Sequence, residues 1–174
     1  MATNTHGVVN TTHCSCWDND ALNYSGIAAT DIDNGTFVAL GDLQKTDEFI
    51  DEYTFTVTAN ANGAASDIMY IVDTPIVGKT IDMQIYNDPR YFYNIAGQAM
   101  SIKQLQKGNC IEVNAEAMEA NATPVDQPTY TLASIGATGK LQMVQQGGSF
   151  RYLGVVERGI GQEVVPHYVF QLMA

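Results

Sequence analysis

The sequence predicts an all-β protein, and three observations support this class. Gly, Thr, Asn, Val and Ile are prominent, whereas long helical stretches rich in Glu, Lys and Leu are missing. Several short runs alternate apolar and polar residues, which is the period of a strand with one buried face. Gly-rich turns separate these runs. With 174 residues, 45% hydrophobic and 16% charged, the chain can bury a core as one domain or as two small lobes.

Residues 1–20 are polar, rich in Thr and Asn, and follow neither the period of a strand nor that of a helix. They predict an extended N-terminal arm. From Tyr24 onward the pattern changes. The pair Asn34-Gly35 is typical of the turn in a hairpin, because both residues accept the positive φ values that a two-residue turn needs. We therefore expect a pair of strands flanking this turn.

The clearest strand lies at 53–59, where Tyr53, Phe55 and Val57 alternate with threonines. The run "DIMYIVD" at 67–73 is apolar on both faces and ends at Thr74-Pro75, which is typical of a central strand. Together these elements predict an N-terminal β lobe over residues 21–80.

A C-terminal lobe is predicted over residues 81–174. Its first part contains "DPRYFYNIAG", which is compatible with one helical turn after Pro89 or with a loop, and we favour the short helix. Five strand-like runs follow, separated by Gly-rich turns: 110–118, 129–134, 140–146, 150–158 and 163–173. Strands at this short spacing predict a compact β-barrel or tulip-like fold.

The charge balance excludes several classes of partner. Eight basic residues against nineteen acidic ones give a net charge of −11, and the basic residues are scattered. No basic patch could neutralise a run of phosphates, so nucleic acid and anionic membrane are not expected partners. The sequence also lacks a basic segment followed by an apolar run near its start, and any apolar stretch long enough to span a bilayer. We expect a protein made in the cytoplasm that stays soluble.

The rare residues gather in "HCSCW", which runs from His13 to Trp17 and holds two of the three cysteines and the only Trp. With His6 it nominally supplies four ligands for a tetrahedral zinc site. Such sites normally use two separated pairs of ligands, however, and here the second pair is missing. The odd number of cysteines also argues against a disulfide framework, so Cys110 is expected to be a buried hydrophobic residue. A docking arm anchored by Trp17 is favoured over a metal site or a redox pair.

No pattern predicts a catalytic residue, a metal ligand or a cofactor site. Asp31-x-Asp33-x-Gly35 resembles the start of a calcium loop, but its Gly comes one residue early and the final Glu is missing. "GATGKL" and "GIGQEV" lack residues of phosphate-binding and dinucleotide-binding loops. His167 lies inside an alternating strand, where a structural role is expected. We therefore expect a protein that is not an enzyme.

Four stretches together resemble small structural proteins of tailed phages that are encoded with the head genes. They are "DIDNGTFVALGDL" (31–43), "DIMYIVDTPIV" (67–77), "YFYNIAGQAMSIKQLQKGNCIEV" (91–113) and "FRYLGVVERG" (150–159). The most recognisable elements are Asn34-Gly35 before a strand, and Ala96-Gly97 leading to Lys107-Gly108-Asn109 and another strand. The chain departs from the family pattern at Met100-Ser101 and at Asn109, where the family tends to have an Arg and an Asp.

The resemblance implies a capsid decoration or head-stabilising protein on the outer surface of the virion. Its implied partner is the major capsid protein, and it implies a homo-oligomer on the capsid, with a trimer favoured. The expected capsid contacts lie in the arm and in the aromatic cluster: Trp17, Cys16, His13, Tyr91, Phe92 and Tyr93. The alternative is a carbohydrate- or receptor-binding β module, in which Trp17, Tyr91 and Tyr93 would form a stacking platform.

Overall fold

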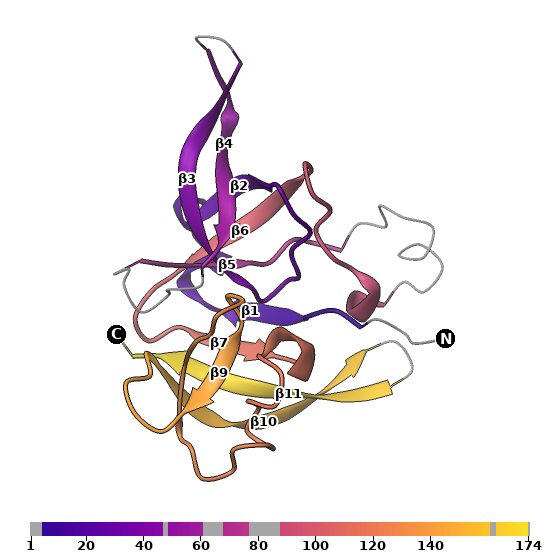
Figure 1. Ribbon diagram of the computed structural model, residues 1–174, viewed down its shortest axis with the longest axis vertical. Coiled ribbons are helices and arrows are strands. Elements are labelled where there is room, and N and C mark those ends of the chain that lie inside the picture. Colours follow the sequence, from indigo (N-terminus) through magenta and orange to yellow (C-terminus); the bar gives the residue numbers. More distant parts are fainter. Residues whose placement is uncertain (1–4, 47–48, 61–67, 77–87, 161–162, 174) are drawn as a thin grey trace.

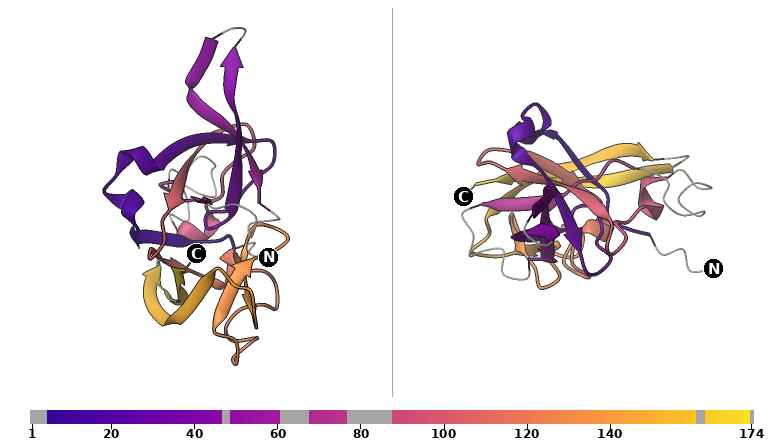
Figure 2. Two further views of the ribbon diagram at one scale, coloured as in Figure 1. Left: turned by 90° about the vertical axis from the view of Figure 1, so that its left-hand side faces the viewer. Right: turned by 90° about the horizontal axis from the view of Figure 1, so that it is seen from above.

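The computed structural model describes residues 5–46, 49–60, 68–76, 88–160 and 163–173. In this part of the chain 52% of the residues lie in strands and 8% in helix, all of it as short 3-10 turns. The predicted all-β class is therefore confirmed. No helix among the described residues is long and apolar enough to cross a membrane. The strands form a closed five-stranded barrel and a six-stranded sheet, which lie one above the other along the long axis (Figures 1 and 2).

The barrel has the strand order β2-β4-β3-β5-β6. Its strands are β2 (Asn23–Ala28), β3 (Phe37–Thr46), β4 (Phe49–Ala59), β5 (Met69–Val72) and β6 (Ala99–Leu105). Strand β2 closes the ring by pairing in parallel with β4 and antiparallel with β6. The barrel encloses its own apolar cluster, consisting of Ala28, Ile32, Val38, Val57, Val72, Met100 and Ile102.

The six-stranded sheet has the order β1-β7-β11-β10-β8-β9, and all its pairs are antiparallel. Its strands are β1 (Val9–His13), β7 (Cys110–Val113), β8 (Leu132–Ile135), β9 (Leu141–Val144), β10 (Phe150–Ile160) and β11 (Glu163–Leu172). Four 3-10 turns complete the described elements: η1 (Ser15–Trp17), η2 (Asp20–Leu22), η4 (Pro89–Tyr91) and η5 (Ala115–Ala117). The turn η4 lies where the sequence favoured a short helix after Pro89.

The two units do not follow the residue ranges expected for the two lobes. Strand β6 lies in the range of the C-terminal lobe but completes the barrel, and the strands after residue 108 join the six-stranded sheet. Strand β1 lies in the range of the arm but forms an edge of that sheet. The chain therefore starts in the sheet, builds the whole barrel and then returns to the sheet.

The extended N-terminal arm is not confirmed. Val9 and Asn10 pair with residues of β7, and Cys14 and Cys16 are buried. The buried position in the middle of β1 is Thr11, whose hydroxyl donates a hydrogen bond to the carboxylate of Asp73. Because a threonine and not an apolar residue occupies this position, the sequence of β1 lacks the alternation that identifies a half-buried strand.

One hydrophobic core continues from the barrel into the sheet. From the barrel side it contains Phe37, Met69, Ile71 and Leu105, and from the sheet side it contains Ile111, Val113, Leu141, Phe150, Tyr168 and Phe170. The rings of Phe37 and Phe150 meet edge to face with their centroids 5.3 Å apart. Aromatic pairs in this geometry contribute about 1 kcal/mol beyond the burial of their surface. The two units therefore share a core and fold as one body.

The turn at Asn34-Gly35 is present, but the hairpin expected around it is wrong. Strands β2 and β3 do not pair with each other; both pair with β4. The buried amide of Asn34 instead accepts a hydrogen bond from the backbone N–H of Thr74 (3.1 Å) and donates one to its carbonyl (3.0 Å). Gly35 has φ +85°, a conformation that glycine adopts without strain. The side chain of Asn34 thus takes the place of a strand neighbour.

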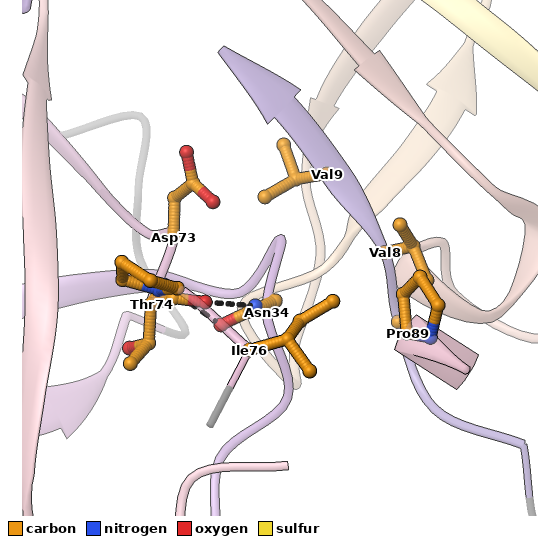
Figure 3. A pocket seen from close by; sticks show the side chains of 9 residues that line it. Val8, Val9, Asn34, Asp73, Thr74, Ile76 and Pro89 are labelled. Carbon is orange, nitrogen blue, oxygen red and sulfur yellow. Dashed lines mark hydrogen bonds between the residues drawn. The ribbon is translucent and has the colours of Figure 1, made fainter. Parts of the chain in front are cut away.

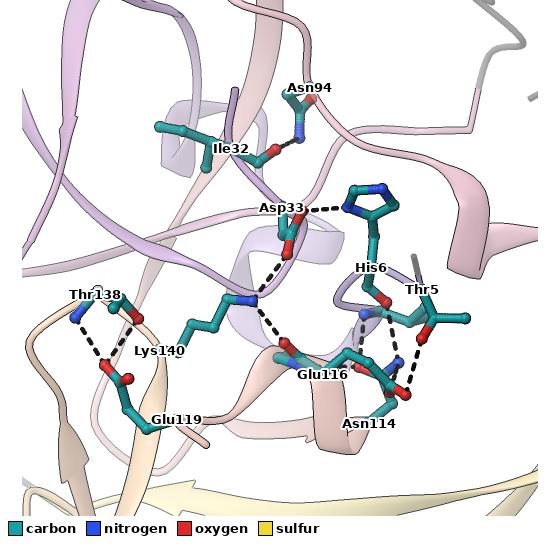
Figure 4. Close-up of polar contacts among 12 residues, drawn as sticks. Thr5, His6, Ile32, Asp33, Asn94, Asn114, Glu116, Glu119, Thr138 and Lys140 are labelled. Carbon is teal, nitrogen blue, oxygen red and sulfur yellow. Dashed lines mark hydrogen bonds and ion pairs between the residues drawn. The ribbon is translucent and has the colours of Figure 1, made fainter. Parts of the chain in front are cut away.

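A polar network joins the turn to the sheet (Figure 4). The carboxylate of Asp33 lies 2.8 Å from Nδ1 of His6 and accepts a hydrogen bond of 2.8 Å from Nζ of Lys140. The same Nζ donates to the carbonyl of Glu116 at 2.7 Å. Burial opposes ionisation of Asp33, but the hydrogen bonds from His6 and Lys140 outweigh it and lower the pKa of this carboxyl. The ionised form is therefore the one that holds the network together.

The substitution Asp33→Asn should lower the free energy of unfolding by about 2 kcal/mol at pH 7, the scale of hydrogen bonds to a charged group. Because the pKa of Asp33 is lower in the folded protein than in the unfolded chain, its contribution is complete above the unfolded value and is lost as the pH falls through the folded one. Urea unfolding at pH 7 and pH 3 should therefore show a smaller difference between variant and parent at pH 3. An equal loss at both pH values would contradict this role, and Asp18→Asn, at an exposed position, serves as the control.

The substitution Thr11→Ala should destabilise the protein by about 1 to 2 kcal/mol, because it removes the hydrogen bond that the buried Thr11 hydroxyl donates to the carboxylate of Asp73. The neighbouring Thr12 is exposed, and Thr12→Ala should change the stability by less than about 0.5 kcal/mol.

Deleting residues 1–20 should abolish cooperative thermal unfolding, since it removes β1 and two core cysteines. Equal effects of the two threonine variants, or an unchanged melting temperature after the deletion, would show that β1 is dispensable.

Candidate functional site

The surface around Trp17 is the candidate functional site, and it is built on the segment that follows β1. In this segment Cys14 and Cys16 are buried in the shared core, whereas Ser15 and Trp17 between and after them are exposed. The backbone turns through η1, in which the N–H of Trp17 donates to the carbonyl of Cys14 at 3.0 Å. The alternation of small buried thiols and exposed residues thus presents the Trp side chain on the outside.

Two asparagines fix this turn to the body of the protein. Asn109 accepts a hydrogen bond from the N–H of Ser15 (3.3 Å) and donates one to its hydroxyl (3.0 Å). Asn23 donates from Nδ2 to the carbonyls of Cys16 (2.9 Å) and Asn19 (3.1 Å). These bonds satisfy backbone groups that a short 3-10 turn leaves free, so the loop is held from both sides.

Trp17 is 56% exposed, yet a second set of contacts also fixes the position of its ring. Nζ of Lys103, on β6, lies 4.9 Å from the centroid of the indole ring. The same ammonium group lies 3.3 Å from the carboxylate of Asp73, which also binds Thr11 of β1. Contacts between a cation and an indole face contribute about 0.5 to 1 kcal/mol at exposed sites. A chain of contacts from β1 through Asp73 and Lys103 therefore orients the Trp ring.

The three thiols are free and lie close to this surface. Cys14 donates from Sγ to the carbonyl of Cys110 at 3.2 Å. Its hydrogen bond with Cys16 and its burial both raise the pKa of the Cys14 thiol, so Cys14 is protonated at neutral pH. Cys110 is only partly buried, which differs from the full burial expected for it.

The nominal zinc ligands of the sequence do not come together. In the described part of the chain no group of three or more His, Cys, Asp or Glu side chains is placed to hold a metal ion. His6, which precedes β1, contacts the carboxylate of Asp33, whereas His13 is exposed at the C-terminal end of β1. The structure therefore offers no support for the tetrahedral site that the spacing of these residues could have suggested.

The residues expected to contact a capsid fall into two groups at opposite ends of β1. At the C-terminal end of β1, His13 and the nearby Trp17 are exposed, whereas Cys16 is buried. The aromatic cluster lies at the other end, where the backbone N–H of His6 donates to the carbonyl of Arg90 and the His6 ring stacks on Tyr93 with centroids 4.8 Å apart. Trp17 and the tyrosines therefore do not form a common stacking platform.

Within the aromatic cluster the side chains differ in exposure. Phe92 is buried, whereas Tyr91 and Tyr93 are partly exposed. Sequence reasoning missed Lys103 and Asp73, because a cation below an indole ring and a carboxylate behind it come from distant strands and leave no local pattern. It also read Tyr53 only as a member of a strand, although its side chain is among the most exposed of the described residues.

A small hollow lies between the start of β1 and the segment after β5 (Figure 3). Its volume is about 170 Å³, and it is lined by Gly7, Val8, Val9, Asn34, Asp73, Thr74, Pro75, Ile76 and Pro89. Sites for small ligands usually have volumes of about 300 to 1,000 Å³. The polar groups of Asn34 and Thr74 in its wall already bind each other. This hollow is therefore a poor candidate for a ligand site.

Comparison of the chain with protein-family models, with curated proteins and with solved structures gave no match.

Thiol reactivity tests the placement of the cysteines. In the folded protein one thiol, that of Cys110, should react readily with a disulfide reagent such as DTNB, because Cys14 and Cys16 are buried and out of reach of the reagent. All three thiols should react after denaturation. Cys110→Ser should abolish the fast phase. A fast phase that persists in this variant would show that Cys14 or Cys16 is accessible.

Proposed function

We propose that the protein is a non-enzymatic structural component of a phage particle that binds the outer surface of the capsid, where it decorates or stabilises the head. The observation that carries the proposal is the Trp17 surface, in which a large aromatic side chain is exposed and yet fixed in place. Its partner would be the major capsid protein, and copies of the chain would assemble on the capsid, with a trimer favoured.

The fixed position of the Trp ring suits binding to another protein. Trp is among the residues that contribute most to protein interfaces when it fills a pocket of the partner. Holding the ring in place before binding reduces the entropy lost on association. The buried cysteines, the two asparagines and Lys103 together provide this preorganisation. In this proposal the contact is made by the body of the protein and not by a free arm.

The sequence resemblance supplies the identity of the partner, and the acidic composition is compatible with it. A net charge of −11 keeps a protein soluble at high concentration and repels other acidic bodies. The alternative, a carbohydrate- or receptor-binding module of a phage particle, requires an aromatic platform. Trp17 would have to provide it alone, since the tyrosines lie beyond the other end of β1.

Binding to undecorated phage heads, measured by co-sedimentation, tests the proposal. Trp17→Ala should weaken binding by about 2 kcal/mol, or about 30-fold. It should lower the free energy of unfolding by no more than about 1 kcal/mol, the scale of the contact between the ring and Lys103. Trp17→Phe should retain part of the affinity. Val125→Ala, at an exposed position in the loop before β8, should bind as the parent does.

If Trp17→Ala binds as tightly as the parent, the Trp17 surface is not the capsid contact and the proposal loses its main support. Gels of purified virions separate the two candidate functions, because a decoration protein is present at high copy number and a receptor-binding module at the copy number of a tail tip.

A further inference from the structure

The hairpin formed by β10 and β11 reaches beyond the strands on either side of it (Figure 1). Strand β10 also pairs with β8, but only at Phe150 and Arg151, and β11 pairs with β7 only from Tyr168 to Gln171. Residues 156–160 of β10 and 163–167 of β11, the outer ribbon, pair only with each other in the described part of the chain. A two-stranded ribbon alone is at best marginally stable in water. Contacts with the body of the protein therefore decide whether the outer ribbon stays ordered.

Titratable side chains make most of these contacts. The buried carboxylate of Glu112 on β7 accepts hydrogen bonds from Nε (2.7 Å) and Nη2 (2.6 Å) of Arg158. Glu163, at the start of β11, accepts one of 2.6 Å from Nη1 of Arg90 in η4. The buried residues of the outer ribbon are Ile160 and His167. A change of protonation can therefore loosen the ribbon.

The ring of His167 is held in its neutral form. It is 2% exposed, and Nδ1 lies 3.1 Å from the carbonyl oxygen of Val165. Because a carbonyl can only accept, Nδ1 carries the hydrogen, and a proton taken up in acid adds to Nε2. Charging a buried group costs free energy unless a partner compensates it. Burial accordingly lowers the pKa of His167.

The charged groups that face His167 do not supply such a partner. They are Glu112 on β7, Arg158 on β10 and Glu116 in η5. The carboxylate of Glu112 is already bound by Arg158, and that of Glu116 accepts a hydrogen bond of 2.7 Å from Nδ2 of Asn114. The two carboxylates favour the charged ring and Arg158 disfavours it, and together they do not overcome the effect of burial on the pKa of His167.

We infer that His167 is a pH-sensitive switch: when its ring takes up a proton, the outer ribbon detaches from the body of the protein while the barrel stays folded. The inference does not rest on the proposed function, because it concerns the protein on its own. It assigns the chain a segment whose order depends on mildly acidic pH.

The direction of the pH dependence follows from proton linkage. His167 has a lower pKa in the closed ribbon than in the detached one, where the ordinary value of 6.5 applies. The neutral ring therefore contributes its full stabilisation above this value, and the contribution is lost as the pH falls below it toward the pKa of the closed form.

Hydrogen exchange of the backbone amides at pH 7.5 and pH 5, corrected for the intrinsic rate at each pH, tests the switch. Peptides from the outer ribbon should lose protection about 10-fold at the lower pH, whereas peptides from β6 in the barrel should keep theirs. His167→Gln cannot be charged, so its ribbon should be equally protected at both pH values. His13→Gln changes an exposed histidine and should keep the parental pH dependence.

Glu163→Gln separates the switch from the general attachment of the ribbon. This variant weakens the contact with Arg90 but leaves His167 in place, so protection of the ribbon should fall at both pH values while its pH dependence remains.

Each outcome decides the matter. Equal protection of the parental ribbon at both pH values overturns the switch, and so does a parental pH dependence in His167→Gln. An equal loss of protection in the barrel shows that acid unfolds the whole protein and also overturns it. If His167→Gln does not fold, an NMR titration of the parental ring decides instead. The ring must take up its proton over the pH range in which the ribbon loses protection, and a mismatch overturns the inference.

Discussion

The pairing of β1 with β7 is the constraint on which the rest of the structure depends. It places the beginning of the chain at the edge of the sheet, while the residues that follow directly enter the core shared with the barrel. The barrel is therefore attached to the sheet at both of its ends, through the segment after β1 and through the short connection from β6 to β7. A change in the orientation of the two units would have to open the core around Phe37 and Phe150, which close packing makes costly.

Polar side chains complete this junction where backbone groups would otherwise lack partners. Asn34 bonds both backbone groups of Thr74, and its Oδ1 also accepts from Nδ2 of the buried Asn94. That same Nδ2 donates to the carbonyl of Ile32, whereas Oδ1 of Asn94 has no partner among the described atoms. Leaving a buried acceptor unpaired costs about 1 to 3 kcal/mol. The other end of this amide reinforces the antiparallel bridge in which Ile32 and Asn94 exchange backbone hydrogen bonds, and it joins that bridge to Asn34.

The sequence predicted the class of the fold and most strands, because those strands carry their own period. It did not predict which strands are neighbours, since pairing depends on contacts between distant residues: β6 completes the barrel, and the Asn34 turn joins no hairpin. It failed for β1, where Thr11 fills the buried position through a hydrogen bond. The exposure of Trp17 at a segment of rare residues could be anticipated. The support from Lys103 and the positive φ of Tyr53 could not, because a cation–π contact and a bulge arise only from the assembled strands.

The exposed aromatic side chains of Trp17 and Tyr53 are positioned by different means, and the difference follows from where they lie. Trp17 belongs to a loop, so packing of the two cysteines that precede it and hydrogen bonds from asparagines can fix it without distorting its backbone. Tyr53 belongs to β4, where it has φ +51° and lies in a bulge of the pairing with β3. The pleat of a strand would direct its side chain according to the regular alternation, and only a break in the pleat can change that direction. Such a break persists only next to a segment that is firmly held. Thr54 meets this need, since it is buried, pairs in register with Ser25 of β2 and lies 3.3 Å from the Ser25 hydroxyl. The strained residue therefore lies at the root of the β3–β4 hairpin, where the barrel can offset its cost, and not farther out along the two strands.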